Sequence, residues 1–241
     1  MKGRIYDMLK TSLASLRDIF FTRECVVCGR VLASDERHLC RDCLDDMPLT
    51  YFWSWRDNPA MERLAGQCRL QDAASLLFYR PEGGYAGCVR QFKYRSDLAL
   101  GAYLSRMLGG YLASGVWFRG IRVVVPVPLH PLKRLKRGFN QSDVIAENVA
   151  ACLPGCRVEK HLLRRRRYTA TQTKKSRGER ASNVSSAFVL DRKKAERLRA
   201  EGVGSILIVD DVLTTGSTLA ACISLLDGMF EVRAATLGFV E

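Results

Sequence analysis

Long apolar segments are missing from this sequence. No uninterrupted apolar run approaches the roughly 18 residues that span a bilayer, so we expect no membrane span and a cytoplasmic location. Charged residues interrupt the N-terminal stretch at Asp7, Lys10, Arg17 and Asp18. The chain has 241 residues, of which 47% are hydrophobic, and this is enough for one substantial core with a small additional module.

The sequence also lacks an even, regularly spaced set of cysteines. It contains nine, and only four of them share a regular spacing, which argues against a secreted disulfide framework and indicates a reducing compartment. The other five lie in or beside apolar or helical stretches, and we expect them to be small buried hydrophobic residues. These five are Cys68, Cys88, Cys152, Cys156 and Cys222.

Acidic residues are few relative to basic ones. The chain has 38 Lys and Arg against 25 Asp and Glu, a formal charge of +13, and residues 131–180 alone hold fourteen basic and four acidic residues. This density predicts an anionic partner near that segment. A small phosphorylated substrate needs only about three or four cations, which leaves room for a nucleic acid. A solvated basic face is the alternative.

Four cysteines form two C-x-x-C pairs, Cys25 with Cys28 and Cys40 with Cys43, separated by eleven residues. Four thiolates at this spacing predict a zinc ribbon with a structural Zn²⁺ ion. A redox-active C-x-x-C and an iron–sulfur cluster are alternatives, and His38 is a less favoured substitute ligand. A site closed by four ligands has no position for substrate, so the ribbon is expected to be a scaffold or docking surface.

A hydroxyl-rich segment follows a continuous apolar run at residues 205–209. Next come Asp210 and Asp211, a Thr/Gly/Ser cluster, and a second apolar stretch at 219–226. This order predicts a buried parallel strand, a loop and a helix. Ligands of such sheets bind beyond the carboxyl ends of the strands.

These residue types suit a sugar phosphate. Adjacent carboxylates accept hydrogen bonds from vicinal hydroxyls, and backbone N–H groups at a helix N-terminus bind phosphate. The loop residues are Thr214, Thr215, Gly216, Ser217 and Thr218. A plain strand-to-helix turn and a phosphoacceptor domain are the alternatives. A Gly-x4-Gly-Lys-Ser/Thr loop is absent, which disfavours an ordinary P-loop NTPase.

The segment from Asp210 to Thr218 resembles the ribose-phosphate signature of type I phosphoribosyltransferases. That resemblance implies that Asp210 and Asp211 hold the ribose hydroxyls and that Thr214 through Thr218 bind the 5-phosphate of phosphoribosyl pyrophosphate. It also implies Mg²⁺, which accompanies the pyrophosphate.

Further segments extend the resemblance to the ComF family of natural competence and DNA uptake, from about residue 16 to 241. They are the stretches 77–79, 92–95, 123–130, 137–142 and 172–180, together with the ribbon-like N-terminus. A glycine beside cations and amides, between a strand and a helix, predicts a pyrophosphate loop. Its residues are Arg137, Gly138, Phe139 and Asn140.

The basic stretch at about 164–182 resembles the mobile loop that closes over the reacting centre in this fold family. Lys174, Arg177 and Arg180 are its candidate phosphate ligands. The same stretch is also suited to tracking a nucleic-acid backbone, with Tyr168 or Phe139 stacking on a base.

The expected architecture is an α/β protein with a type I phosphoribosyltransferase-like parallel sheet flanked by helices. Ile5, Leu9 and Leu13, continued by Leu16 and Phe20, predict an amphipathic helix over residues 1–21. The zinc ribbon would occupy 22–47, a connecting strand and helix region 48–118, and the phosphoribosyltransferase-like domain 119–241, ending in a strand at 233–240.

Three functions follow from these features. The first is a ComF-type phosphoribosyltransferase-like protein that handles internalised single-stranded DNA, with competence or DNA-processing proteins as partners. The second is a non-enzymatic nucleic-acid-binding or adaptor protein that retains the ribose-phosphate pocket. The third is nucleobase salvage, for which the N-terminal half offers no recognisable base-binding hood. No acceptor site is apparent in the sequence.

Overall fold

The structure is a computed structural model that describes residues 23–94, 97–130, 132, 134–135, 138–166 and 187–241. The predicted helix over 1–21 lies outside these residues. So do the candidate phosphate ligands Arg137, Lys174, Arg177 and Arg180.

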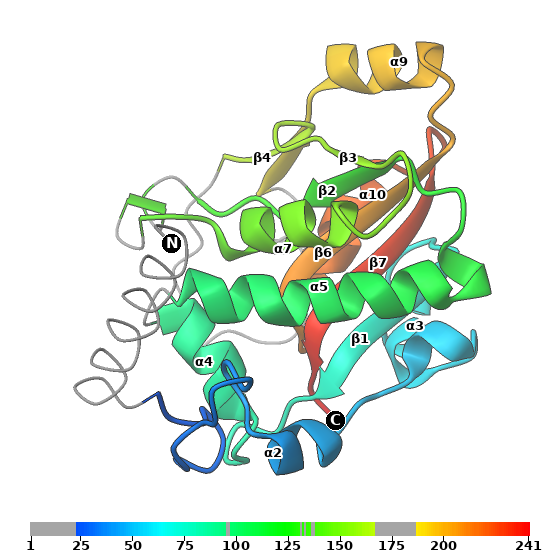
Figure 1. Cartoon of the computed structure of the whole chain (residues 1–241). Coiled ribbons are helices and arrows are strands. Elements are labelled where there is room, and N and C mark those ends of the chain that lie inside the picture. Colours follow the sequence, from blue (N-terminus) through cyan, green and yellow to red (C-terminus); the bar gives the residue numbers. More distant parts are fainter. Residues whose placement is uncertain (1–22, 95–96, 131, 133, 136–137, 167–186) are drawn as a thin grey trace, which may run out of the picture.

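A sheet of five parallel strands forms the centre of the protein, in the order β1-β7-β6-β2-β3 (Figure 1). The strands are β1 (Asp72–Phe78), β2 (Val123–Pro126), β3 (Arg157–Val158), β6 (Ser205–Leu213) and β7 (Glu231–Phe239). Residues 206–209 of β6 are completely buried, as expected for an apolar strand covered on both faces. The predicted α/β fold with a helix-flanked parallel sheet is confirmed.

Helices cover both faces of this sheet. In Figure 1, α5 (Leu98–Ser114) and α7 (Gln141–Ala150) lie side by side in front of the strands, and α10 (Ser217–Ser224) lies behind them. The other helices are α2 (Arg41–Asp45), η1 (Phe52–Ser54), α3 (Pro59–Ala65), α4 (Ala86–Tyr94), η2 (Val116–Phe118) and α9 (Arg192–Ala200). One apolar cluster continues from Leu39 and Cys40 to Leu237 in β7, so the cysteine module packs on the body.

Two strands differ from the sequence prediction. The strand predicted over 205–209 continues to Leu213, because β7 keeps pairing with β6 through Val212 with Gly238 and Leu213 with Phe239. Asp210 and Asp211 therefore lie within the last residues of β6 and not beyond its end. β1, which was placed in the connecting region, pairs with β7 and forms one edge of the sheet. The domain boundaries themselves stay a prediction.

The start of the predicted mobile loop is also different. Leu163–Arg165 form strand β4, which pairs with β5 (Phe188–Leu190) as a two-stranded antiparallel sheet. Arg164 and Arg165 therefore belong to regular structure, because Val189 and Phe188 lie opposite them in the ladder. The remainder of that predicted loop, from residue 167, lies outside the described part of the chain.

Candidate functional site

The four predicted cysteine ligands come together at the N-terminal end of the described chain. The sulfur atoms of Cys25, Cys28, Cys40 and Cys43 all lie within 4.8 Å of one another. A tetrahedral ion with metal–sulfur bonds of about 2.3 Å would hold two sulfurs about 3.8 Å apart. The Sγ atoms of Cys28 and Cys40 are separated by 3.7 Å. This spacing fits one ion such as zinc better than an iron–sulfur cluster, whose several atoms would separate the cysteines further.

The backbone around Cys25 favours its thiolate, whereas burial raises the pKa of the Cys43 thiol well above its usual value. Burial opposes ionisation of Cys25, but backbone amides of Cys28, Cys40 and Val27 donate to its sulfur and lower its pKa to about 6. His38 points elsewhere, since its ring lies 5.5 Å from the ring of Tyr103 in α5. The four cysteines therefore form a group that could hold a metal ion, and His38 is not part of it.

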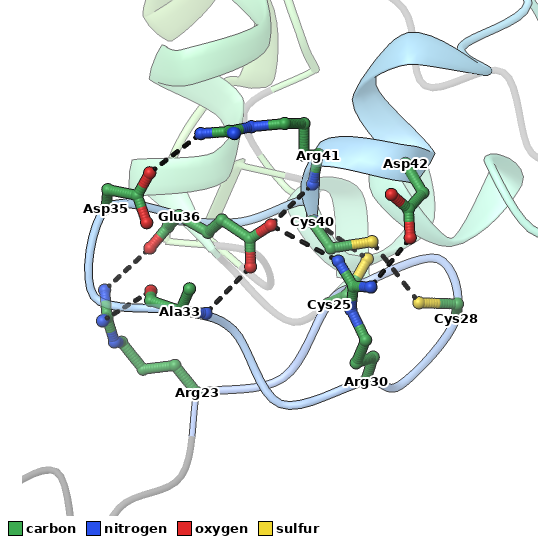
Figure 2. Close-up of polar contacts among 10 residues, drawn as sticks. All are labelled: Arg23, Cys25, Cys28, Arg30, Ala33, Asp35, Glu36, Cys40, Arg41 and Asp42. Atoms are coloured by element: carbon green, nitrogen blue, oxygen red, sulfur yellow. Dashed lines mark hydrogen bonds and ion pairs between the residues drawn. The ribbon is translucent and has the colours of Figure 1, made fainter.

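Glu36 holds the loop between the two cysteine pairs, a role that the sequence analysis missed. Its carboxylate accepts hydrogen bonds from the backbone N–H groups of Ala33, at 2.8 Å, and Arg41, at 2.7 Å (Figure 2). Arg30 bridges Glu36, at 3.4 Å, and Asp42, at 2.7 Å. The loop is therefore tied to the start of α2, beside Cys40.

Side chains from two helices, α7 and α4, contact the acidic pair near the end of β6. Asp210 accepts a hydrogen bond of 3.0 Å from the hydroxyl of Ser142 in the first turn of α7. Lys93, near the end of α4, forms an ion pair of 2.7 Å with Asp211. Burial of the carboxyl group, and then the adjacent Asp211 carboxylate, raise the pKa of Asp210 to about 7. Lys93 lies in the stretch 92–95 that contributes to the ComF resemblance, and its ammonium is paired with a carboxylate.

The hydroxyl-rich loop connects β6 to α10 and lines a small hollow. Residues 212–219 surround this hollow together with Asp210. Gly216 caps α10 with a left-handed φ of 82°, and a Cβ atom there would lie 2.9 Å from the side chain of Gln67 and 3.0 Å from that of Leu64. Glycine is therefore required by both the conformation and the close approach of α3.

Two side chains hold this loop, one in α3 and one just beyond its C-terminal end, and the sequence offers no signal for them. Arg63 donates to the carbonyl oxygen of Thr214 at 2.9 Å, and Gln67 donates to that of Thr215 at 2.8 Å. In a trans peptide the N–H group points away from the C=O group of the same unit. The N–H groups of Thr215 and Gly216 are therefore directed away from α3.

The described part of the predicted pyrophosphate loop leads into α7. Gly138 is exposed and has a left-handed φ of 82°, and the Asn140 side chain donates to the carbonyl oxygen of Val127 at 3.1 Å. Asn140 is buried and is the N-cap residue of α7. These contacts suit a structural role for Asn140 in joining the end of β2 to α7.

Arg165, in β4, is a partly buried member of the basic stretch. Its guanidinium lies 5.1 Å from the centre of the Phe188 ring. Burial lowers the pKa of Arg165, and the charge of Asp210 partly offsets that effect.

The remaining cysteines are partly as predicted. Cys88 and Cys222 are buried, whereas Cys68, Cys152 and Cys156 are only partly buried.

None of the helices within the described residues combines the length and the apolar composition of a membrane-spanning segment.

Fold and site together define an α/β protein with a helix-flanked parallel sheet, an acidic pair before a phosphate-suited loop, and a four-cysteine module. No protein-family model matches the chain. It is 36% identical over 141 residues to DNA utilization protein YhgH of Salmonella typhimurium, covering 57% of this chain and 59% of the relative.

Two longer matches identify the family. The chain is 30% identical over 205 residues to DNA utilization protein YhgH of Escherichia coli O6:H1, covering 84% of this chain and 83% of the relative. It is 30% identical over 200 residues to competence protein ComFC of Bacillus subtilis, covering 81% and 68%. The chain belongs to the ComF family.

Proposed function

We propose that this chain binds phosphoribosyl pyrophosphate with Mg²⁺ and acts as a phosphoribosyltransferase-like protein in the handling of internalised single-stranded DNA. One observation carries the proposal: Asp210 and Asp211 lie near the end of a parallel strand, and the loop that follows leads into a glycine-capped helix with its amides turned away from α3. The names of the relatives, DNA utilization protein and competence protein, support a role in competence and DNA uptake.

In this proposal Asp210 and Asp211 accept hydrogen bonds from the ribose hydroxyls. The N–H groups and hydroxyls of residues 214–218 bind the 5-phosphate, which is favoured at a helix N-terminus. The Ser142 hydroxyl orients Asp210 through its 3.0 Å hydrogen bond. Arg137 and the backbone of residues 138–140 would bind pyrophosphate, with Lys174, Arg177 and Arg180 closing over it. Mg²⁺ supplies charge neutralisation of the pyrophosphate when bound.

Transfer requires a nitrogenous acceptor that attacks the ribose carbon while the bond to pyrophosphate breaks. Water competes with the acceptor for the same oxocarbenium-like ribose carbon, so an enzyme must exclude water and absorb the charge of the leaving pyrophosphate. Pyrophosphate release, measured with nucleobases, nucleotides and oligonucleotides in turn, identifies the acceptor. Pyrophosphate release with nucleobases but not with nucleotides or oligonucleotides would indicate a salvage enzyme. Absence of pyrophosphate release with every acceptor would indicate a binding protein.

Calorimetry tests the donor site. Phosphoribosyl pyrophosphate with Mg²⁺ is titrated into the wild type and into the double variant Asp210→Asn with Asp211→Asn. We expect affinity to fall by about tenfold or more, because hydrogen bonds to charged groups contribute about 1.5–3 kcal/mol each. Asp57→Asn removes an exposed carboxylate before α3 and is the control. Equal binding by the double variant and the wild type would refute the site.

A second candidate, the nucleic-acid-binding or adaptor protein, is favoured by the excess positive charge between residues 131 and 180. Arg164 and Arg166 are exposed at β4. Affinity for a single-stranded oligonucleotide should fall steeply with salt, and Arg166→Glu should reduce the slope by about one released counterion. A wild-type affinity independent of salt would refute this candidate.

A further inference from the structure

Helix α4 begins against the cysteine module. The Tyr85 hydroxyl, just before the helix, donates to the carbonyl oxygen of Cys43 at 2.9 Å. A Cβ atom on Gly87 would lie 3.2 Å from the carbonyl oxygen of Val26, and one on Gly84 would lie 3.2 Å from the Val27 side chain. The start of α4 is thus in close contact with the loop between Cys25 and Cys28 and with Cys43 of the second cysteine pair.

The last turn of the same helix contacts three parts of the candidate donor site. The Lys93 ammonium forms the 2.7 Å ion pair with Asp211. The backbone carbonyl of Lys93 accepts a hydrogen bond of 3.3 Å from the side chain of Gln141, the first residue of α7. The Phe92 ring centre lies 6.1 Å from that of Phe139, in the predicted pyrophosphate loop.

Packing prevents α4 from moving independently of its neighbours. Cys88, Val89 and Phe92 are completely or almost completely buried. Phe92 lies so close to Gly101 of α5 that a Cβ atom there would come within 2.2 Å of its ring. Nine helical residues span about 13 Å, so one rigid element connects the two regions. Figure 1 shows α4 extending from the N-terminal segment toward the start of α5.

We propose that α4 couples the two sites, so that metal binding by the four cysteines holds Lys93 in position against Asp211. Lys93 is a positioning residue in this arrangement, because its ammonium fixes one carboxylate of the acidic pair. The metal stabilises a segment too small to fold on its own core. Its loss releases the Val26 and Cys43 contacts that hold the start of α4. The donor-site role of Asp211 rests on the proposed function, whereas the mechanical coupling does not.

Hydrogen exchange of the full chain tests the coupling without any ligand. The zinc-loaded and chelator-treated proteins are compared, with amides of β6 and β7 as an internal reference. On chelation, we expect the exchange rate to rise in residues 23–47 and also in residues 86–94 and 141–145. The rise should be at least about fivefold, because coupling between two sites typically changes an equilibrium by about fivefold or more. An increase confined to residues 23–47 would overturn the proposal.

A variant that keeps the metal covers the case in which chelation unfolds the chain. Gly87→Ala pushes α4 from the Val26 carbonyl, whereas Gly110→Ala adds the same methyl group to α5 where no atom lies within 4 Å. In the zinc-loaded protein, Gly87→Ala should raise exchange in residues 91–94 and Gly110→Ala should not. Unchanged exchange in Gly87→Ala would overturn the coupling.

Ligand affinity then separates this inference from the proposed function. Lys93→Met and its control Lys193→Met, at an exposed lysine of α9, are titrated with phosphoribosyl pyrophosphate and Mg²⁺ in zinc-loaded and stripped forms. We expect stripping to weaken binding about fivefold in Lys193→Met and much less in Lys93→Met, because coupled changes are not additive. Equal losses in both variants would overturn the positioning role of Lys93. Absence of binding in every protein would refute the proposed function and leave the exchange result to decide the coupling.

Discussion

Replacing Asp210 by asparagine should make the stability of this protein less dependent on pH. The folded protein raises the pKa of Asp210 from 3.8 to about 7, first through burial and then through the carboxylate of Asp211. A raised pKa means that the folded state favours the protonated carboxyl group. The stability from this group is complete below pH 3.8 and is lost as the pH rises through 7.

The expected size follows from the two pKa values. Each pKa unit corresponds to about 1.4 kcal/mol, so ionisation of Asp210 destabilises the fold by about 4 kcal/mol in total, of which about 2–3 kcal/mol arises between pH 5 and pH 8. Urea unfolding of the wild type and of Asp210→Asn at these two pH values measures the difference. The free energy of unfolding of the variant minus that of the wild type should be about 2–3 kcal/mol higher at pH 8 than at pH 5.

The comparison has built-in controls. Both proteins carry the same cysteine cluster, so the pH dependence of metal binding cancels in the difference. Asp57→Asn, at an exposed position, should follow the wild type at both pH values. If the difference between Asp210→Asn and the wild type stayed constant from pH 5 to pH 8, the account of a buried, repelled carboxyl group would be refuted.

Three further outcomes are expected. Cys28→Ser should lower the zinc content, measured by metal analysis, well below one ion per chain. Cys68→Ser, at a cysteine outside the cluster, should keep the zinc content of the wild type. Equal zinc contents in the two variants would contradict the four-cysteine site. Gly101→Ala should destabilise the fold by about 1–3 kcal/mol in urea unfolding, because its methyl group overlaps the Phe92 ring, and Gly110→Ala should not. Arg63→Met should weaken phosphoribosyl pyrophosphate binding in calorimetry by roughly tenfold, since the loop loses a charged donor at Thr214, and unchanged affinity would contradict this role.

Local patterns in the sequence were sufficient for several features. The two C-x-x-C pairs predicted a four-cysteine cluster, because two short loops bring four thiols to one point. The apolar run at 205–209 predicted a buried parallel strand, because alternation is absent where both faces are covered. The ribose and phosphate roles of residues 210–218 stay predictions.

Tertiary structure alone decided how these parts meet. Strand length depended on pairing with β7, which carries β6 past the acidic pair to Leu213. The side chains that contact the loop and the acidic pair lie 68 to 151 residues away in the chain, so no local spacing in the sequence predicts them. They are Arg63, Gln67, Lys93 and Ser142. The sequence thus determined which residues are chemically suited to a metal and to a sugar phosphate. Only the packing of α3, α4 and α7 against the end of β6 determined which side chains orient them, because those contacts arise from helices far apart in sequence.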